Sequence, residues 1–165
     1  MITNTTKDKG DYGLISVMRI LAKQGIKTCL PVSEHLPFDL IAVNEKAQLL
    51  RVSVKHVKLY RDAIAVHLYS VYSNTKVTVA KRIDTSMIDC IAVYCPELDS
   101  CFFISAEQIS QHKKVFTLKP RALLKRPSYS SVNNIAEDFQ EISPLFKDGG
   151  KLENCILTTF ESGQV

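Results

Sequence analysis

The sequence predicts a single globular domain of the α/β (α+β) class. The chain has 165 residues, 45% of them hydrophobic, and its mean hydropathy is +0.00. A chain of this size can bury roughly two-thirds of its unfolded surface in one core. One helical pattern near the N-terminus is followed by many short β-rich runs, which Gly, Pro and polar turns separate. This succession of a helix and short strands indicates a mixed fold rather than an all-α or all-β one.

The N-terminal helix is predicted from apolar residues that recur at positions i, i+3, i+4 and i+7. These residues are Leu14, Val17, Met18 and Leu21. The segment Gly10-Asp11-Tyr12-Gly13 leads into the helix, and Gly25 ends it. As a member of this apolar stripe, Leu14 is expected in the core.

A β-hairpin is predicted after this helix. A short strand, Ile26–Leu30, stops at Pro31, and two further β-rich runs, Phe38–Val43 and Leu49–Lys55, flank the polar segment Asn44–Gln48. A polar segment between two such runs is typical of a hairpin turn.

The register of this hairpin brings three polar side chains together. If the turn centres on Lys46, Asp39 lies opposite Ser53. Side chains two residues apart on a strand share a face, so Lys55 joins this pair. One carboxylate and one lysine can hold a divalent cation and polarise a phosphate. The alternative interpretation is a surface ion pair with little effect on stability.

The rest of the chain is predicted to form further short elements. Strands are expected at Ala63–Val71, Lys76–Ala80, Asp89–Tyr94, Cys101–Ile104 and Phe116–Leu118, and helices at Ala106–Ile109 and Val132–Phe139. We expect residues 1–9 to be disordered, residues 10–142 to form the domain, and residues 143–165 to form a loose tail.

Cysteine usage and hydropathy indicate a cytoplasmic protein with reduced thiols. Five cysteines are present, an odd number with no Cys-x-x-Cys pair: Cys29, Cys90, Cys95, Cys101 and Cys155. No apolar run approaches the roughly 18 residues that a membrane span needs, and the first residues show no signal-peptide pattern. We therefore expect no membrane association.

Positive charge is concentrated in two stretches, although the net charge is only +4. Residues 46–61 and 108–136 contain lysine and arginine but no acidic residue. If they form one face, they predict binding to duplex DNA through phosphate contacts. The candidate contacts are Arg51, Lys58, Arg61, Lys113, Lys114, Lys119, Arg121, Lys125 and Arg126. A solvated basic face without a ligand is the alternative.

The hairpin motif resembles that of the PD-(D/E)XK nucleases. Pro37-Phe38-Asp39 matches its first half and Ser53-Val54-Lys55 its second half, with serine where the family has an acid or glutamine. Further similar segments extend the resemblance to the small group I intron-associated PD-(D/E)XK homing endonucleases, over most of the chain. These segments are Gly10–Gly13, Met87–Glu97, Phe102–Glu107, Phe116–Arg121 and Asn134–Phe139.

This resemblance implies a restriction-endonuclease-like fold, in which a mixed β-sheet is flanked by helices. It also implies an Mg²⁺-dependent enzyme that cuts duplex DNA as a homo-oligomer, a dimer or tetramer. Asp39 and Lys55 match catalytic positions, and Asp39 matches a metal ligand. Ser53 takes a position that is usually acidic, and Leu14 occupies the position of a further acid on the first helix.

Three functions therefore remain open. The chain is an active endonuclease with an incomplete motif, a catalytically inactive relative that still binds DNA, or a protein-interaction module. In an active enzyme, Glu34 or Asp11 could supply a missing metal ligand, and His35 or His56 could act as a base, although a structural role is the alternative for each. In a homo-oligomer, the helix Val132–Phe139 or the strand residues Ile91–Tyr94 could form the contact.

Overall fold

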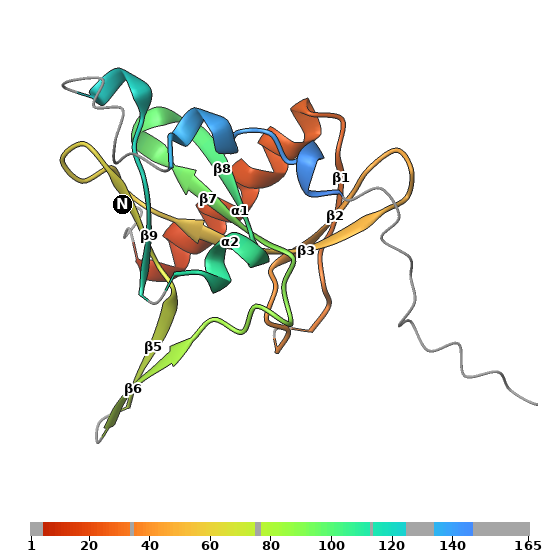
Figure 1. The fold of residues 1–165 in the computed structure, drawn as a ribbon. Helices are drawn as coiled ribbons and strands as arrows, with labels where there is room; N and C mark the ends of the chain where they lie inside the picture. The colour runs from red at the N-terminus through yellow and green to blue at the C-terminus, as the bar shows by residue number, and fades with distance from the viewer. Residues whose placement is uncertain (1–4, 34, 75–76, 113, 125–133, 147–165) are drawn as a thin grey trace, which may run out of the picture.

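The protein is built around one five-stranded mixed sheet (Figure 1). The computed structural model describes residues 5–33, 35–74, 77–112, 114–124 and 134–146, with the backbone alone for residues 70–74 and 77–80. The strand order is β1 (Lys27–Cys29), β2 (Leu40–Val43), β3 (Leu49–His56), β7 (Cys90–Cys95) and β8 (Ser100–Ser105). Strands β3 and β7 are parallel and the other neighbours antiparallel. The predicted mixed sheet is therefore confirmed.

Helix α1 (Thr6–Lys23) already includes the segment Gly10–Gly13, which was expected to lead into it, and residues 6–9, which were expected to be disordered. A capping box explains the early start: the Thr5 hydroxyl accepts from the Asp8 N–H at 3.2 Å, and the Asp8 carboxylate accepts from the Thr5 N–H at 2.8 Å. These bonds satisfy backbone donors that the first helical turn leaves unpaired, which offsets the low helix propensity of Gly10. At the other end, Gly25 adopts a φ of 77°, as predicted for a helix stop.

The sheet separates two hydrophobic layers, and the side chains of β7 alternate between them. Cys90, Ala92 and Tyr94 pack on the α1 side with Val17 and Leu21 of the helix, in what we call the helix-side core. The intervening residues of β7 pack into the opposite layer, which we call the strand-side core. All six residues of β7 are buried. The expectation that Ile91–Tyr94 forms an oligomer contact is therefore wrong, because both faces of this strand are already covered.

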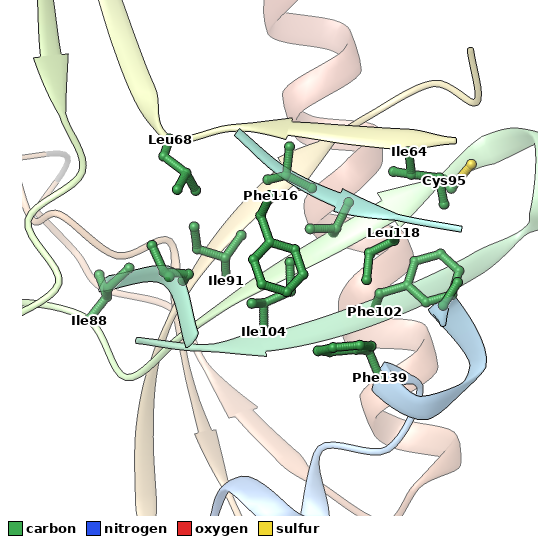
Figure 2. Packing of buried hydrophobic residues seen from close by; sticks show 14 residues of the cluster. Ile64, Leu68, Ile88, Ile91, Cys95, Phe102, Ile104, Phe116, Leu118 and Phe139 are labelled. Atoms are coloured by element: carbon green, nitrogen blue, oxygen red, sulfur yellow. The ribbon is translucent and has the colours of Figure 1, made fainter. Parts of the chain in front are cut away.

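The strand-side core is closed by a second, two-stranded sheet of β4 (Ile64–His67) and β9 (Val115–Leu118). Figure 2 shows Phe116 and Leu118 of β9 lying against Phe102 and Ile104 of the main sheet. The pairing joins segments about fifty residues apart in the chain, since Ile64 lies opposite Leu118.

The sequence predicts one strand over Ala63–Val71, but this run forms parts of two strands, β4 and β5. It breaks at Leu68, whose buried side chain packs in the strand-side core and whose N–H donates to Lys114 O at 3.0 Å. Beyond Leu68, β5 (Tyr69–Asn74) leaves the core and pairs only with β6 (Val77–Arg82). This ribbon projects away from the body of the domain (Figure 1).

The last described segment packs more tightly than the sequence predicts. Helix α2 (Ala106–Ser110) is present, but residues 136–139 form a 3₁₀ helix rather than the end of an α-helix, and residues 132–133 lie outside the described part. Ile142 is fully buried in the helix-side core, and Leu145 and Phe146 pack against it. Residues 143–146 are therefore not a loose tail.

Most cysteines in the described part of the chain are buried. Cys90, Cys95 and Cys101 are buried, Cys29 is exposed, and all four are free. Burial raises the pKa of the Cys90 thiol to about 12, so it stays protonated and acts as a small apolar side chain. Cys155 lies outside the described residues. No helix in the described part of the chain is long and apolar enough to cross a membrane.

Candidate active site at the β2–β3 hairpin

The hairpin register is the one that the sequence predicts. Leu40 lies opposite Val52 and Val43 opposite Leu49, so Asp39, directly before β2, faces Ser53. The Asp39 N–H also donates to Val52 O at 2.9 Å, which extends the ladder by one bond. The polar turn fixes this register, because the side-chain oxygen of Asn44 accepts backbone N–H groups from two later turn residues, at 3.0 and 2.9 Å.

The Asp39 carboxylate is held in place by its neighbours on β3. Its Oδ2 atom accepts from the Ser53 hydroxyl at 3.3 Å and from the Val54 N–H at 2.5 Å. Ser53 is only 7% exposed, whereas Asp39 is exposed. The other carboxylate oxygen, Oδ1, accepts no hydrogen bond from the described residues and is available to a ligand. Ser53 therefore orients Asp39 and leaves one oxygen free.

Asp39, Ser53 and Lys55 line one cavity of about 280 Å³. Three further charged residues line this cavity: Lys81 and Arg82 at the end of β6, and Asp84 just after it. Lys81 is exposed, and Arg82 donates from Nη2 to His112 O at 2.8 Å. The cavity therefore contains the three polar hairpin residues that the sequence predicts to share one face. It also contains charged residues from β6 and from the segment that follows it.

Asp84 is a carboxylate that sequence reasoning missed as a site residue. Its carboxylate caps a turn: Asp84 Oδ1 accepts from the Ser86 hydroxyl at 2.7 Å and from the Ser86 N–H at 3.0 Å. These hydrogen bonds, with a smaller contribution from Lys81, hold the pKa of Asp84 below its usual range. Asp84 lies 45 positions after Asp39 in the sequence. The two residues line one cavity because β6 ends close to the β2–β3 hairpin.

Among the described residues, the remaining candidate acids and bases do not line this cavity. Leu14 and Val54 pack against the helix-side core, whereas strand alternation directs Ser53 and Lys55 to the other face of the sheet. The His56 ring lies on the helix side, with its centroid 6.0 Å from that of Tyr94. His35 is exposed, Asp11 is exposed on α1, and neither lines the cavity. Glu34 lies outside the described residues.

Arg51 is not a free cation for DNA. Its guanidinium donates to both carboxylate oxygens of Asp89, at 2.9 and 3.1 Å, and its N–H donates to Asp89 Oδ2 at 2.6 Å. Burial raises the pKa of Asp89, but the hydrogen bonds from Arg51 outweigh this effect and hold it below its usual value. The pair lines a different cavity, of about 710 Å³, and Lys55 is not among the residues that line it.

The other basic candidates differ in their surroundings. Arg121 lies 3.7 Å from Asp138, so an acid from outside the basic stretch partly offsets its charge. Lys114 and Lys119 flank β9 and are exposed, and Lys58 and Arg61 are exposed after β3. Lys113, Lys125 and Arg126 lie outside the described residues. Because β9 pairs with β4, the two basic stretches lie closer in space than in sequence.

The sequence of residues 4–142 matches the PD-(D/E)XK endonuclease family. The chain belongs to this family. No curated protein matches it. Its fold is similar to that of a solved bacterial homing endonuclease, I-Ssp6803I, with a TM-score of 0.67 and 18% identity over 86% of this chain and 93% of that one. A Holliday junction resolvase from Archaeoglobus fulgidus is also similar, with a TM-score of 0.49 and 14% identity over 83% and 94%. The family match confirms the expected family, and the likeness to the homing endonuclease confirms the expected restriction-endonuclease-like fold.

Proposed function

We propose that this protein is an endonuclease that hydrolyses phosphodiester bonds of duplex DNA with the help of Mg²⁺, as homing endonucleases do. The observation that carries the proposal is the shared cavity of Asp39 and Lys55, at the hairpin positions of the PD-(D/E)XK motif. An anchored carboxylate beside a lysine is the minimal pair for holding a cation and binding a phosphate.

The residues of this cavity offer hard oxygen ligands that suit Mg²⁺. Asp39 Oδ1 would hold the ion, and Asp84 lines the same cavity and could supply a second carboxylate. The described residues contain no group of three or more His, Cys, Asp and Glu side chains that could hold a metal. This is compatible with Mg²⁺, which is usually bound through one or two carboxylates and keeps waters and substrate phosphates as its other ligands. When bound, the ion supplies charge neutralisation and lowers the pKa of a bound water.

The side chains of the chain have separate tasks in this proposal. Ser53 orients Asp39 through its hydroxyl, and the Val54 N–H holds the same carboxylate oxygen. Lys55 places a positive charge beside the scissile phosphate, where negative charge develops during hydrolysis. Lys81, which lines the same cavity, adds a second cation and favours entry of a phosphate.

A catalytically inactive DNA-binding relative is the second candidate. It is favoured by Ser53, since a neutral hydroxyl is a weaker cation ligand than a carboxylate. It is also favoured by Leu14, an apolar residue that packs against the helix-side core where the family has an acid. Both candidates predict DNA binding, and they differ in cleavage.

A nicking assay on supercoiled plasmid distinguishes these candidates. The natural chain is compared with Asp39→Ala and Lys55→Ala, in Mg²⁺ and in Mn²⁺, and binding to a duplex is measured in parallel. An active enzyme nicks DNA, and both substitutions abolish nicking while binding remains. Binding without nicking supports the inactive relative, and the absence of both supports the protein-interaction module.

Cleavage of both strands of a duplex leads to a proposal on assembly. Two active sites of opposite polarity are needed, so we propose a symmetric homo-oligomer, a dimer or tetramer. Light scattering at micromolar concentration is expected to give a mass above the 18.5 kDa of one chain, and a monomer would contradict this proposal.

A further inference from the structure

A second cavity, of about 480 Å³, adjoins the candidate active site. Lys55 lines both cavities. Four residues with aromatic or imidazole rings and one further lysine also line it: His56, Tyr60, His67, Tyr69 and Lys58. The volume falls within the range of roughly 300–1,000 Å³ that is typical of small-ligand sites. A group bound here would therefore lie directly beside a phosphate at Lys55.

Tyr60 is presented to this cavity by a tight turn. The Tyr60 N–H donates to Ala63 O at 2.9 Å, and the Ala63 N–H donates to Tyr60 O at 3.2 Å. These two backbone hydrogen bonds between Tyr60 and Ala63 close the turn. Arg61 adopts a φ of 54° inside it. The Arg61 guanidinium lies 5.3 Å from the centre of the Tyr60 ring. The Tyr60 side chain is nevertheless 70% exposed, which leaves ring surface available to a ligand.

The chemistry of the lining selects a flat, anionic ligand. The described residues that line the cavity include two lysines and no carboxylate. Aromatic rings stack on nucleobases regardless of the base, because every base has a π-face, and lysines attract the linked phosphates. A paired base cannot use such a site, since its faces are covered by the neighbours in the duplex.

We infer that this cavity receives one unstacked nucleotide of the DNA, whose base stacks on Tyr60 while the adjacent phosphate lies at Lys55. This inference rests on the proposed DNA-directed function and adds a subsite to it. It predicts a preference for DNA with a locally opened base pair or an unpaired nucleotide.

The test compares two labelled duplexes that differ by one unpaired, bulged nucleotide. Binding is followed by fluorescence anisotropy in EDTA, which prevents cleavage. For the natural chain we expect the bulged duplex to bind about tenfold more tightly, as is usual for stacking of one base on an aromatic side chain. Tyr60→Phe is expected to keep this preference because the ring remains, and Tyr60→Ala to reduce the ratio to about one.

Tyr12→Ala is the matched control. Tyr12 is also an exposed tyrosine, at 54%, but it lies on α1, and its ring is 5.6 Å from that of Tyr94 on the helix side of the sheet. This variant is expected to keep the natural preference. Circular dichroism verifies that each variant is folded.

The outcomes separate this inference from the proposed function. If the natural chain binds paired DNA but shows no preference for the bulge, or if Tyr60→Ala keeps that preference, the subsite is refuted and the proposed function stands. Equal weakening of both duplexes by Tyr60→Ala would also refute it, since Tyr60 would then be a general contact. If the natural chain binds neither duplex, the DNA-directed function fails, and the subsite with it.

Discussion

Replacing Ser53 by glutamate would place a second carboxylate beside Asp39. The Ser53 hydroxyl lies 3.3 Å from Asp39 Oδ2, and the site is largely buried on the Ser53 side. Two carboxylates about 4 Å apart near a protein surface repel by about 4 kcal/mol at an effective dielectric constant of about 20. Asp39 is exposed, so solvent screening reduces the expected loss of unfolding free energy to about 1–2 kcal/mol.

A bound cation is expected to reverse this effect. Affinity for hard divalent cations follows the charge of their ligands, so Ser53→Glu should bind Mg²⁺ or Mn²⁺ at least about tenfold more tightly than the natural chain. The pH dependence has a defined sign. Repulsion raises the folded-state pKa of the carboxylate pair, so the destabilisation is present at pH 7 and diminishes as the pH falls towards that pKa.

The assay combines calorimetric titration of metal with denaturant unfolding and the plasmid nicking rate. Ser53→Gln is the matched control, because it adds the same bulk and a carbonyl oxygen without the charge. The difference in unfolding free energy and metal affinity between the two variants is then due to the charge of the added carboxylate. If Ser53→Glu and Ser53→Gln are equally stable and bind metal equally, the reasoning is refuted, and the assignment of Asp39 and Lys55 to a metal and phosphate site fails.

Three further predictions concern the core and the basic surface. Leu14→Glu is expected to cost about 2 kcal/mol of unfolding free energy with no gain in metal affinity, because Leu14 packs on the other face of the sheet; tighter metal binding would contradict this. Asp89→Asn should lose about 1–2 kcal/mol at pH 7, where the Arg51 pair is intact, as measured by denaturant unfolding. The folded-state pKa of Asp89 is lowered, so the stabilisation by the Arg51–Asp89 pair is fully present above about pH 4 and is lost as the pH falls through that pKa. The difference in unfolding free energy between Asp89→Asn and the natural chain should therefore vanish in acid. Charge reversal of Lys119 and Arg121 should weaken duplex binding for every sequence tested and flatten its salt dependence; binding that is insensitive to salt in the natural chain would favour the protein-interaction module.

The sequence was sufficient for the hairpin and for the family. Strand alternation and a polar turn are local properties, so centring the turn on Lys46 was enough to pair Asp39 with Ser53, and this register is observed. The apolar spacing of α1 is equally local, and it placed Val17 and Leu21 in the core. The sequence did not show that α1 begins at Thr6, because the capping box of Thr5 and Asp8 offsets the low helix propensity of Gly10.

The tertiary structure decided everything that depends on contacts between distant segments. It broke the run Ala63–Val71 at Leu68, paired Arg51 with Asp89, and brought Asp84 to the cavity of Asp39. Sequence patterns report which face of an element is apolar, but not which element covers that face or which charges meet there. A basic stretch without acidic residues can therefore be partly neutralised by an acid from another part of the chain. A second carboxylate can likewise reach a site from 45 residues away. Both are possible because the entropic cost of closing a loop grows only slowly with its length, so sequence separation says little about which residues become neighbours.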